Sequence, residues 1–393
     1  MQDNFFKKKF KIIFPILTLT LLYIISAKLG LLLAFEQVNT SPVWPPTGVA
    51  LAAIILGGLR LWPGVFIGSF LVNLYVSSSL TLSTSIAIGN TLEAVIAGYF
   101  ILRFASLNFL SKNSETAIFI FSLFGATMIS ASIGVGSLVI ANVITQEQVL
   151  LLWETWWMGD FVAGLILTPF LLTWYRLPIE HFTKKRLFEA FFILSVTLCF
   201  VGVVFDQWAV FALSEELVIF SLLPIIAWSA LRFHHHGATL LLLIISTAAI
   251  IGTTNGVGPF VLLNENDSLL HLQAYMGAAM FTALLLMASQ GERLQAYKEI
   301  NLSKKQLEAT ITARTQELNE SNALLENKIL QKNDLTDSLK DLLYNIDHSS
   351  HDEFYVNCAK TLAQFYKTQF VLIGLFSDKK TYKNKNIGGL GKR

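Results

Sequence analysis

The chain has 393 residues, of which 53% are hydrophobic and only 14% are charged, and its mean hydropathy is +0.56. This composition is too apolar for an ordinary soluble protein, and it excludes intrinsic disorder, a collagen-like fibre and a small disulfide scaffold. A formal net charge of +2 is too small to favour nucleic-acid binding. The composition therefore predicts a membrane protein that has the lipid bilayer as its first partner.

Charge divides the chain into two parts. Residues 291–393 hold more than half of all charged side chains. Before them, apolar runs of roughly 17 to 25 residues repeat, and a helix of that length crosses a ~30 Å hydrocarbon core. The first run follows a basic N-terminus, residues 1–11, and lacks a convincing small-residue cleavage site. We therefore interpret it as a retained first helix with a cytoplasmic N-terminus.

The membrane part, residues 12–290, divides into ten predicted spans. They cover 12–34, 43–59, 61–78, 84–103, 115–143, 151–175, 187–209, 215–231, 237–258 and 271–290. The connection around Gly57–Pro63 is so tight that the second and third spans could form one bent or re-entrant element, and eight spans are the alternative. Either even number places both termini on the same side of the membrane.

Charged residues agree with this division when the loops alternate from a cytoplasmic start. The cytoplasmic loops then hold Lys and Arg, whereas the outer loops hold acidic residues and no Lys or Arg. Positive charge in short loops resists translocation. The predicted fold class is thus an all-α polytopic membrane protein of about eight to ten helices, with both termini in the cytoplasm.

Two carboxylates, Glu93 and Asp160, fall inside apolar runs. A bare carboxylate at that depth costs roughly 3 kcal/mol or more unless it is paired, protonated or wetted. These two residues are therefore the first candidates for a ligand pocket or a polar switch, and a structural hydrogen-bonded pair is the alternative. Asn73 and Asn90 are their candidate partners.

Two tryptophans complete the candidate set. Trp44 precedes Pro45 and Pro46, which remove two backbone donors and predict a break in the helix. Freed backbone at membrane depth survives only inside protein or beside water, although a rigid entry to the second span is the simpler alternative. Trp157 lies in a Trp-rich stretch near the outer face, where an interfacial belt is more common than a binding cage.

Three consecutive histidines, His234, His235 and His236, suggest a metal site at first sight. Three adjacent residues on one helix cannot all face one ion. They also follow Arg232 at a predicted cytoplasmic end, where a flanking cluster of polar and charged residues is favoured. We expect no metal site and no other cofactor.

After Gly291 the apolar pattern changes to a seven-residue repeat. With Ile311, Leu318 and Leu325 at position a, ten of the fifteen core positions between 297 and 346 are apolar. This repeat predicts a coiled coil over 291–346 that continues the last membrane helix, in a parallel homodimer. Polar residues at the central d positions weaken the seam, which suits a signal-carrying helix; a mere spacer is the alternative.

The last segment, residues 347–393, begins with a polar stretch. Helical periodicity over 354–366 and an apolar run over 370–376 that is typical of a buried strand follow it. One helix and one strand cannot build a core of their own. We therefore expect an incomplete α/β segment here.

Seven sequence blocks, in order along residues 12–290, resemble the first type of the bacterial membrane-associated sensor (MASE) domain. They read SPVWPPTGVALA, RLWPG, IGNTLEA, ISASIG, WWMGD, ALRF and GTTNGVGPF. Two shorter likenesses follow: residues 313–322 resemble the linker helix of sensor kinases, and residues 353–376 are similar to the opening helix and strand of a GAF domain.

This resemblance implies an integral-membrane input module ahead of an output domain, typically a histidine kinase or a diguanylate cyclase, in the inner membrane of a bacterium. It brings no catalytic residues, and the sequence contains no phosphoacceptor helix, ATP-binding domain or Gly-Gly-Asp-Glu-Phe motif, so we expect no enzyme activity. The expected stimulus is an unknown small ligand or a membrane partner protein. The alternative function is a transporter or channel with a dimerising tail, which broken helices and intramembrane carboxylates would suit.

Overall fold

The computed structural model describes residues 2–33, 41–175, 184–205, 220–348 and 350–366, together with residue 371. Within these residues every regular element is a helix, and the predicted all-α class is confirmed. The chain forms two units, Met1–Tyr297 and Lys298–Arg393, which are described separately.

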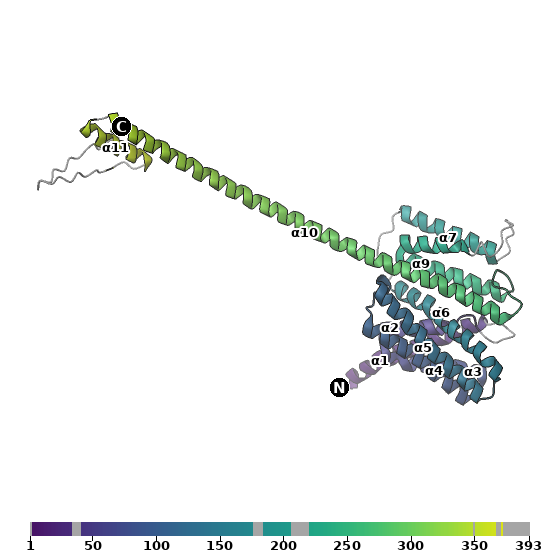
Figure 1. Cartoon of the computed structure of the whole chain (residues 1–393). Helices are drawn as coiled ribbons and strands as arrows, with labels where there is room; N and C mark the ends of the chain where they lie inside the picture. The colour runs from purple at the N-terminus through teal and green to yellow at the C-terminus, as the bar shows by residue number, and fades with distance from the viewer. Residues whose placement is uncertain are drawn as a thin grey trace. The chain divides into compact units, whose positions relative to one another are not determined.

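The first unit is a bundle of apolar helices (Figure 1). In chain order they are α1 Gln2–Leu32, α2 Pro45–Gly57, α3 Trp62–Ser77, α4 Leu80–Phe104, α5 Asn113–Ile140, α6 Val149–Tyr175, α7 Lys184–Phe205, α9 Leu222–Thr254 and the start of α10, Glu265–His348. The 3-10 turns η1 Leu59–Leu61, η2 Phe109–Ser111 and η3 Gln146–Gln148 join some of them. Among the described residues, eight helices are long and apolar enough to cross a membrane.

The second helix shows how local sequence sets a boundary. Pro45 and Pro46 occupy its first turn, where a missing N–H leaves no hydrogen bond broken and the fixed φ of proline already suits a helix. The helix ends before Gly58, whose φ of 85° lies in the left-handed region that favours glycine. The break that the Trp-Pro-Pro sequence predicts is therefore present, as the entry to a new helix.

The tight connection around Gly57–Pro63 joins two separate helices, α2 and α3, which do not form one bent element. With 13 residues, α2 is about 20 Å long at 1.5 Å per residue, which is shorter than the ~30 Å hydrocarbon core. The single turn η1 separates it from α3. The second and third predicted spans thus each have a helical counterpart, although α2 falls below the length of the eight long helices.

A break divides α9 into two segments. His234 has non-helical backbone angles, φ 53° and ψ −144°, so the segments 222–233 and 235–254 are two helices that meet at this residue. They correspond to the eighth and ninth predicted spans. With these segments counted separately and the short α2 included, each of the ten predicted spans has a helical counterpart.

Close helix contacts hold the bundle together. Helix α4 packs against α3 and α5, while α2 packs against α6 and α4. Small residues allow these approaches: a Cβ added to Gly48 of α2 would lie 2.4 Å from the Cβ of Leu167 in α6, and one added to Gly98 of α4 would lie 2.4 Å from a methyl carbon of Ile54 in α2. Such contacts are the usual means of helix association in lipid, where apolar burial alone gives little preference.

The second unit contains the rest of α10 and a short helix, α11 His351–Phe365. Helix α10 has no break between Glu265 and His348. The a-position residues Ile311, Leu318 and Leu325 are more than half exposed in the single chain. The apolar run expected to form a strand, 370–376, lies outside the described residues except for Val371.

Substitution of Gly48 by alanine tests the α2–α6 contact. We expect the free energy of unfolding to fall by about 1–3 kcal/mol, because the added methyl group overlaps the Leu167 side chain and the helices must separate. The measurement is unfolding of the detergent-solubilised protein in a denaturant titration. Gly125→Ala is the matched control: it lies within α5 and no atom lies within 4 Å of an added Cβ, so it should be neutral or stabilise by up to about 1 kcal/mol. Equal effects of the two substitutions would contradict this packing.

Candidate functional site

A chain of buried polar side chains crosses the interior of the bundle. The Asn90 amide of α4 donates to the Tyr23 hydroxyl of α1 at 3.0 Å and to the Ser69 hydroxyl of α3 at 2.9 Å. Its carbonyl oxygen accepts from Ser130 of α5 at 2.9 Å, and the same hydroxyl lies 3.3 Å from a carboxylate oxygen of Asp160 in α6. This polar network (Tyr23, Ser69, Asn90, Ser130 and Asp160) therefore joins five helices.

The network ends at a pair of buried carboxyl groups. Asp160 is 1% exposed and Glu93 is 3% exposed, and their carboxyl groups interact with each other and with the hydroxyls of Thr47 and Ser130. Apart from the contact between the two carboxyl groups, Oδ1 of Asp160 and Oε2 of Glu93 accept no hydrogen bond from another described residue. Buried polar groups in native proteins are nearly always satisfied, so the pair has hydrogen-bonding capacity for a further polar contact.

A cavity of about 560 Å³ lies beside this pair. Its wall includes Trp44, Asn73, Asn90, Trp156 and Asp160, together with apolar residues of α3, α4, α5 and α6. A volume of several hundred Å³ with an apolar lining and a few convergent polar groups is typical of a small-molecule site.

At the end of the bundle where the cavity lies, helix α10 contacts both the segment before α2 and helix α6. Gln273 is fully buried and donates to the carbonyl of Pro42 at 2.8 Å and to that of Thr155 at 3.1 Å. Asn266, in the first turn of α10, lines the cavity itself. Any movement of the Trp44 segment relative to α6 must therefore displace or strain the start of α10.

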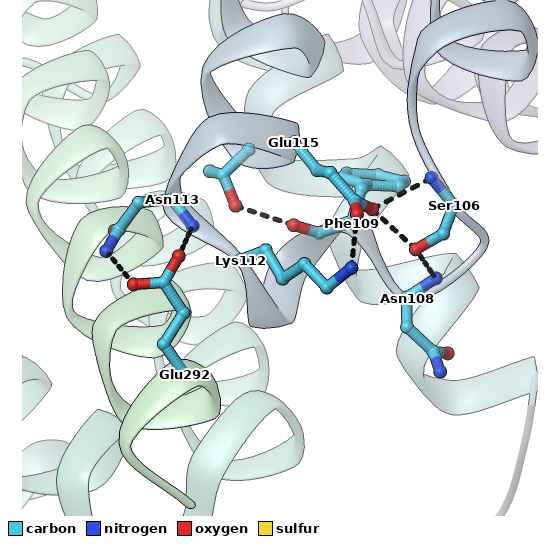
Figure 2. A network of polar contacts seen from close by, with 8 residues as sticks. Ser106, Asn108, Phe109, Lys112, Asn113, Glu115 and Glu292 are labelled. Carbon is cyan, nitrogen blue, oxygen red and sulfur yellow. Dashed lines mark hydrogen bonds and ion pairs between the residues drawn. The ribbon is translucent and has the colours of Figure 1, made fainter. Parts of the chain in front are cut away.

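The same helix is held a second time, near Glu292. The backbone N–H and the side-chain amide of Asn113, at the start of α5, donate to the two carboxylate oxygens of Glu292 at 2.8 Å each (Figure 2). Ser289 lies one turn earlier and donates to the Asn113 carbonyl oxygen at 3.3 Å. A Cβ on Gly291 would lie 2.5 Å from the carbonyl oxygen of Ser111, so the loop backbone touches α10 directly.

Polar contacts within the α4–α5 connection fix this loop. Glu115 accepts from the backbone and hydroxyl of Ser106 and pairs with Lys112 at 2.8 Å, as Figure 2 shows. The hydrogen bond to Glu115 and its charge raise the pKa of Lys112 above the ordinary value. The Phe109 carbonyl accepts from Thr116 at 2.8 Å. Residues 106–116, held in this way against Glu292, are called the loop clamp below.

The loop clamp also reaches the break in α9. The Ser111 hydroxyl lies 3.1 Å from Nε2 of His235. The neighbouring His236 ring packs edge-on against Trp174, with 5.5 Å between ring centroids. The first residue of the triplet, His234, forms the break itself. Among the described residues no group of three or more His, Cys, Asp or Glu side chains could hold a metal ion.

The structure brings most of the sequence-predicted site residues together. Glu93, Asp160 and Asn90 share the polar network or contact it, and Trp44 lines the cavity. Asn73 also lines the cavity; its amide donates to the Ser69 backbone carbonyl at 2.9 Å and reaches the Ser69 hydroxyl of the network at 3.4 Å.

Trp157 lies elsewhere. Its ring stacks on Trp153 at 5.4 Å and meets Phe124 edge-on at 4.9 Å, and its N–H points to the Phe124 carbonyl. The adjacent Trp156 lines the cavity instead. On a helix, neighbouring residues point about 100° apart, and the order of residues alone does not say which tryptophan faces inward.

Several site residues carried no clear signal in the sequence. Ser69, Ser130 and Thr47 are small hydroxyl residues in apolar helices, where such side chains commonly bond to the preceding turn of their own helix. Gln273 was not among the candidate residues, although an amide side chain inside an apolar run is as unusual as those of Asn73 and Asn90, which were. It is separated from Pro42 by more than two hundred residues, and the sequence does not indicate that the two meet.

Removal of the central amide tests the network. We expect Asn90→Ala to lower the free energy of unfolding by about 2 kcal/mol, because three side-chain hydrogen bonds inside a membrane protein are lost at about 0.6 kcal/mol each and their partners stay buried. Unfolding in detergent is the measurement. Thr84→Ala on the exposed face of the same helix, where the hydroxyl bonds to the Leu80 carbonyl, should change stability by less than about 0.5 kcal/mol. A loss no larger at Asn90 than at Thr84 would contradict the network.

The comparisons with known proteins agree with a bundle of membrane helices. The family model MASE1 matches residues 16–294, which include every described residue that lines the cavity and the residues of α10 that contact the loop clamp. No curated protein and no solved structure matches the chain. Because the matched region covers well over half of the sequence, the chain belongs to the MASE1 family of membrane-associated sensor domains.

Proposed function

We propose that this chain is the sensory input module of a bacterial signalling protein and passes a stimulus through a dimeric coiled coil to a cytoplasmic output domain. The observation that carries the proposal is the course of α10. This single helix lines the cavity at its first turn, is held by the loop clamp at Glu292, and continues without a break through the heptad repeat.

The two contact points of α10 lie at opposite ends of the bundle. Gln273 and Glu292 are 19 residues apart, about 28 Å along a helix, close to the thickness of the hydrocarbon core. Helix α5 repeats this arrangement, with Asn113 at its start and Leu138 at the cavity about 37 Å further on. A stimulus at the cavity therefore has a direct mechanical route to the clamp through two packed helices.

A polar contact of this kind suits a helix that can adopt two positions relative to its neighbours. A ligand shifts an equilibrium only as far as its affinities for the two states differ. The hydrogen bonds between Asn113 and Glu292 either form or break, and they are short-range and directional. Repacking at the cavity that moves α10 along or about its axis would exchange these bonds for contacts with water, which gives the coiled coil two arrangements.

The exposed seam of α10 supports a homodimer. Ile311, Leu318 and Leu325 lie seven residues apart and are each more than half exposed in the single chain. A regular apolar stripe of this type is buried when a second copy pairs with it in parallel. The weak polar centre of the seam lets the pair change register or twist, which is how the signal would travel beyond the membrane.

The distribution of charge supports cytoplasmic termini in a bacterial inner membrane. Contacts at the clamp end gather Lys112, Arg232 and Arg293 near one another in the fold: Ser111 meets both Gly291 and the break in α9 that follows Arg232. The connections at the cavity end, 141–148 and 255–264, contain no Lys or Arg. Positive charge marks the cytoplasmic side, so the clamp and the coiled coil face the cytoplasm.

The output domain is proposed from the resemblance of the C-terminal segment. Residues 353–376 resemble the opening helix and strand of a GAF domain, the helical α11 is compatible with that resemblance, and a histidine kinase or diguanylate cyclase would follow it in a complete signalling protein. The module described here would carry no catalysis of its own. Its partners would be the bilayer, a second copy of the chain, and a small ligand or a membrane protein as the stimulus.

The loop clamp can be tested in the chain fused in frame to the kinase half of a sensor histidine kinase. We expect Glu292→Ala to change basal autophosphorylation about fivefold or more, because it removes two of the three hydrogen bonds between α10 and Asn113 of α5 and leaves only that of Ser289. Asn113→Ala should act in the same direction but less, since its backbone N–H remains. Glu326→Ala, at an outward b position of the heptad, is the control. Unchanged output in both clamp variants would refute transmission through this contact.

The dimer is tested by cysteine crosslinking in a background that carries Cys199→Ser and Cys358→Ser. Under mild oxidation in membranes, Leu318→Cys at position a should form a crosslinked dimer in high yield, because paired a positions face each other across the seam. Ala323→Cys, at the outward f position, should crosslink at least fivefold less. Equal yields at the two positions would exclude a parallel coiled coil in this register.

Uptake of labelled amines or amino acids by proteoliposomes of the same protein would instead support the transporter alternative.

A further inference from the structure

The wall of the cavity has an unusual charge balance. Asp160 is the only charged side chain among the described residues that line it, and no Lys, Arg or His is among them. Undescribed residues 34–40 lie between α1 and the Trp44 segment, and their sequence contains no basic residue. Among the described residues that line the cavity, the Asp160 carboxyl group therefore has no basic side chain beside it.

The pair needs compensation for its burial. A carboxylate buried at membrane depth needs a partner, and apart from the contact between the two carboxyl groups, Oδ1 of Asp160 and Oε2 of Glu93 accept no hydrogen bond from another described residue. The groups near the pair are the hydroxyls of Thr47 and Ser130 and the indole of Trp156. These neighbours offer single donors, and none supplies a positive charge.

The remaining wall indicates what else an occupant would carry. Trp44 and Trp156 place two indole rings on the cavity, and aromatic faces attract cations. Leucine, isoleucine and valine side chains from α3 to α6 make up most of the rest, with Asn73 and Asn90 as additional hydrogen-bonding groups. An occupant that matches this surface has a compact cation at one end and an apolar body.

We propose that the cavity binds a small organic amine, with its ammonium group on Asp160, which lines the cavity and contacts Glu93, and its apolar body against the aliphatic and indole wall. A volume of about 560 Å³ accommodates a molecule of the size of an arylalkylamine with room for bound water. This assignment rests on the proposed sensory function and names the chemical class of its stimulus.

The surroundings of the cavity favour entry of a cation. Gln148, at the end of η3, and Asn266, in the first turn of α10, belong to the connections that close this end of the bundle and line the cavity. Glu147, Glu265 and Asp267 flank them in the sequence, and no Lys or Arg occurs in either connection. A field of one sign around an opening raises the local concentration of oppositely charged ligands.

The test uses matched probes on the full chain in lipid nanodiscs. Three amines, hexylamine, phenethylamine and tryptamine, are each compared with the alcohol of the same skeleton, 1-hexanol, 2-phenylethanol and tryptophol, and with the corresponding carboxylates. Isothermal titration at neutral pH gives the dissociation constants, and empty nanodiscs give the contribution of partitioning into lipid. We expect at least one amine to bind tenfold or more tightly than its alcohol, and the carboxylates to bind more weakly still.

Variants locate the selectivity. Asp160→Asn keeps the shape of the side chain and removes the charge, so the preference for the amine should disappear, and Glu93→Gln should reduce it. Asp334→Asn is the control, because this exposed carboxylate lies in the heptad repeat of α10 and does not line the cavity. If a variant fails to fold, the comparison of amines with their alcohols on the wild-type chain still decides the proposal.

Each outcome bears on one proposal. Equal affinity for every amine and its alcohol would show that the carboxyl pair is satisfied by its own protons and would overturn the amine assignment. Retention of the preference in Asp160→Asn would overturn it as well. If amines fail to bind while Glu292→Ala still shifts kinase output in the fusion, the ligand class is wrong and the sensory function stands. If amines bind selectively but neither they nor the clamp variants alter output, the sensory function is wrong.

Discussion

The structure depends on the cost of burying polar groups where no water is present. A carboxyl group inside an apolar bundle is tolerated only with partners, and the partners of Asp160 and Glu93 come from α2, α4, α5 and α6. Satisfying two acids thus requires several helices to meet at one point. Asn90 extends the same requirement to α1 and α3, so the polar network fixes the arrangement of the N-terminal six helices while close glycine contacts fill the space between them.

The polar network stabilises the bundle but leaves hydrogen-bonding capacity unused, and a function of this site would depend on that unused capacity. A fully satisfied interior would favour one packing, whereas the carboxyl pair accepts few hydrogen bonds from other described residues and its Asp160 faces a cavity, so a ligand in that cavity could add contacts to the pair. The start of α10 is anchored to the cavity wall through Gln273. Helix α10 is thus attached to the bundle at the cavity end and again at Glu292.

The clamp at Glu292 answers a different physical requirement. At the membrane boundary water competes for every hydrogen bond, so a single exposed contact contributes little. The clamp combines a two-point contact from Asn113 to Glu292 with a loop that Glu115 and Lys112 hold in shape and with a direct backbone approach at Gly291. Several modest contacts at one place therefore hold α10 to the α4–α5 connection and to the start of α5.

The sequence by itself determined the class of the protein. Hydropathy and the seven-residue repeat are one-dimensional patterns, and they predicted the helical membrane part, ten apolar segments and the exposed stripe of α10 from local spacing alone. The same logic selected Glu93, Asp160, Asn90 and Asn73, because a polar group in an apolar run is unusual wherever it lies. Only the tertiary structure decided which of these side chains meet, that Trp156 rather than Trp157 lines the cavity, and that Gln273 and Glu292 attach α10 to residues far away in the chain. Those facts depend on helix rotation and on contacts between distant segments, and both are set by how close-packed surfaces interlock in three dimensions.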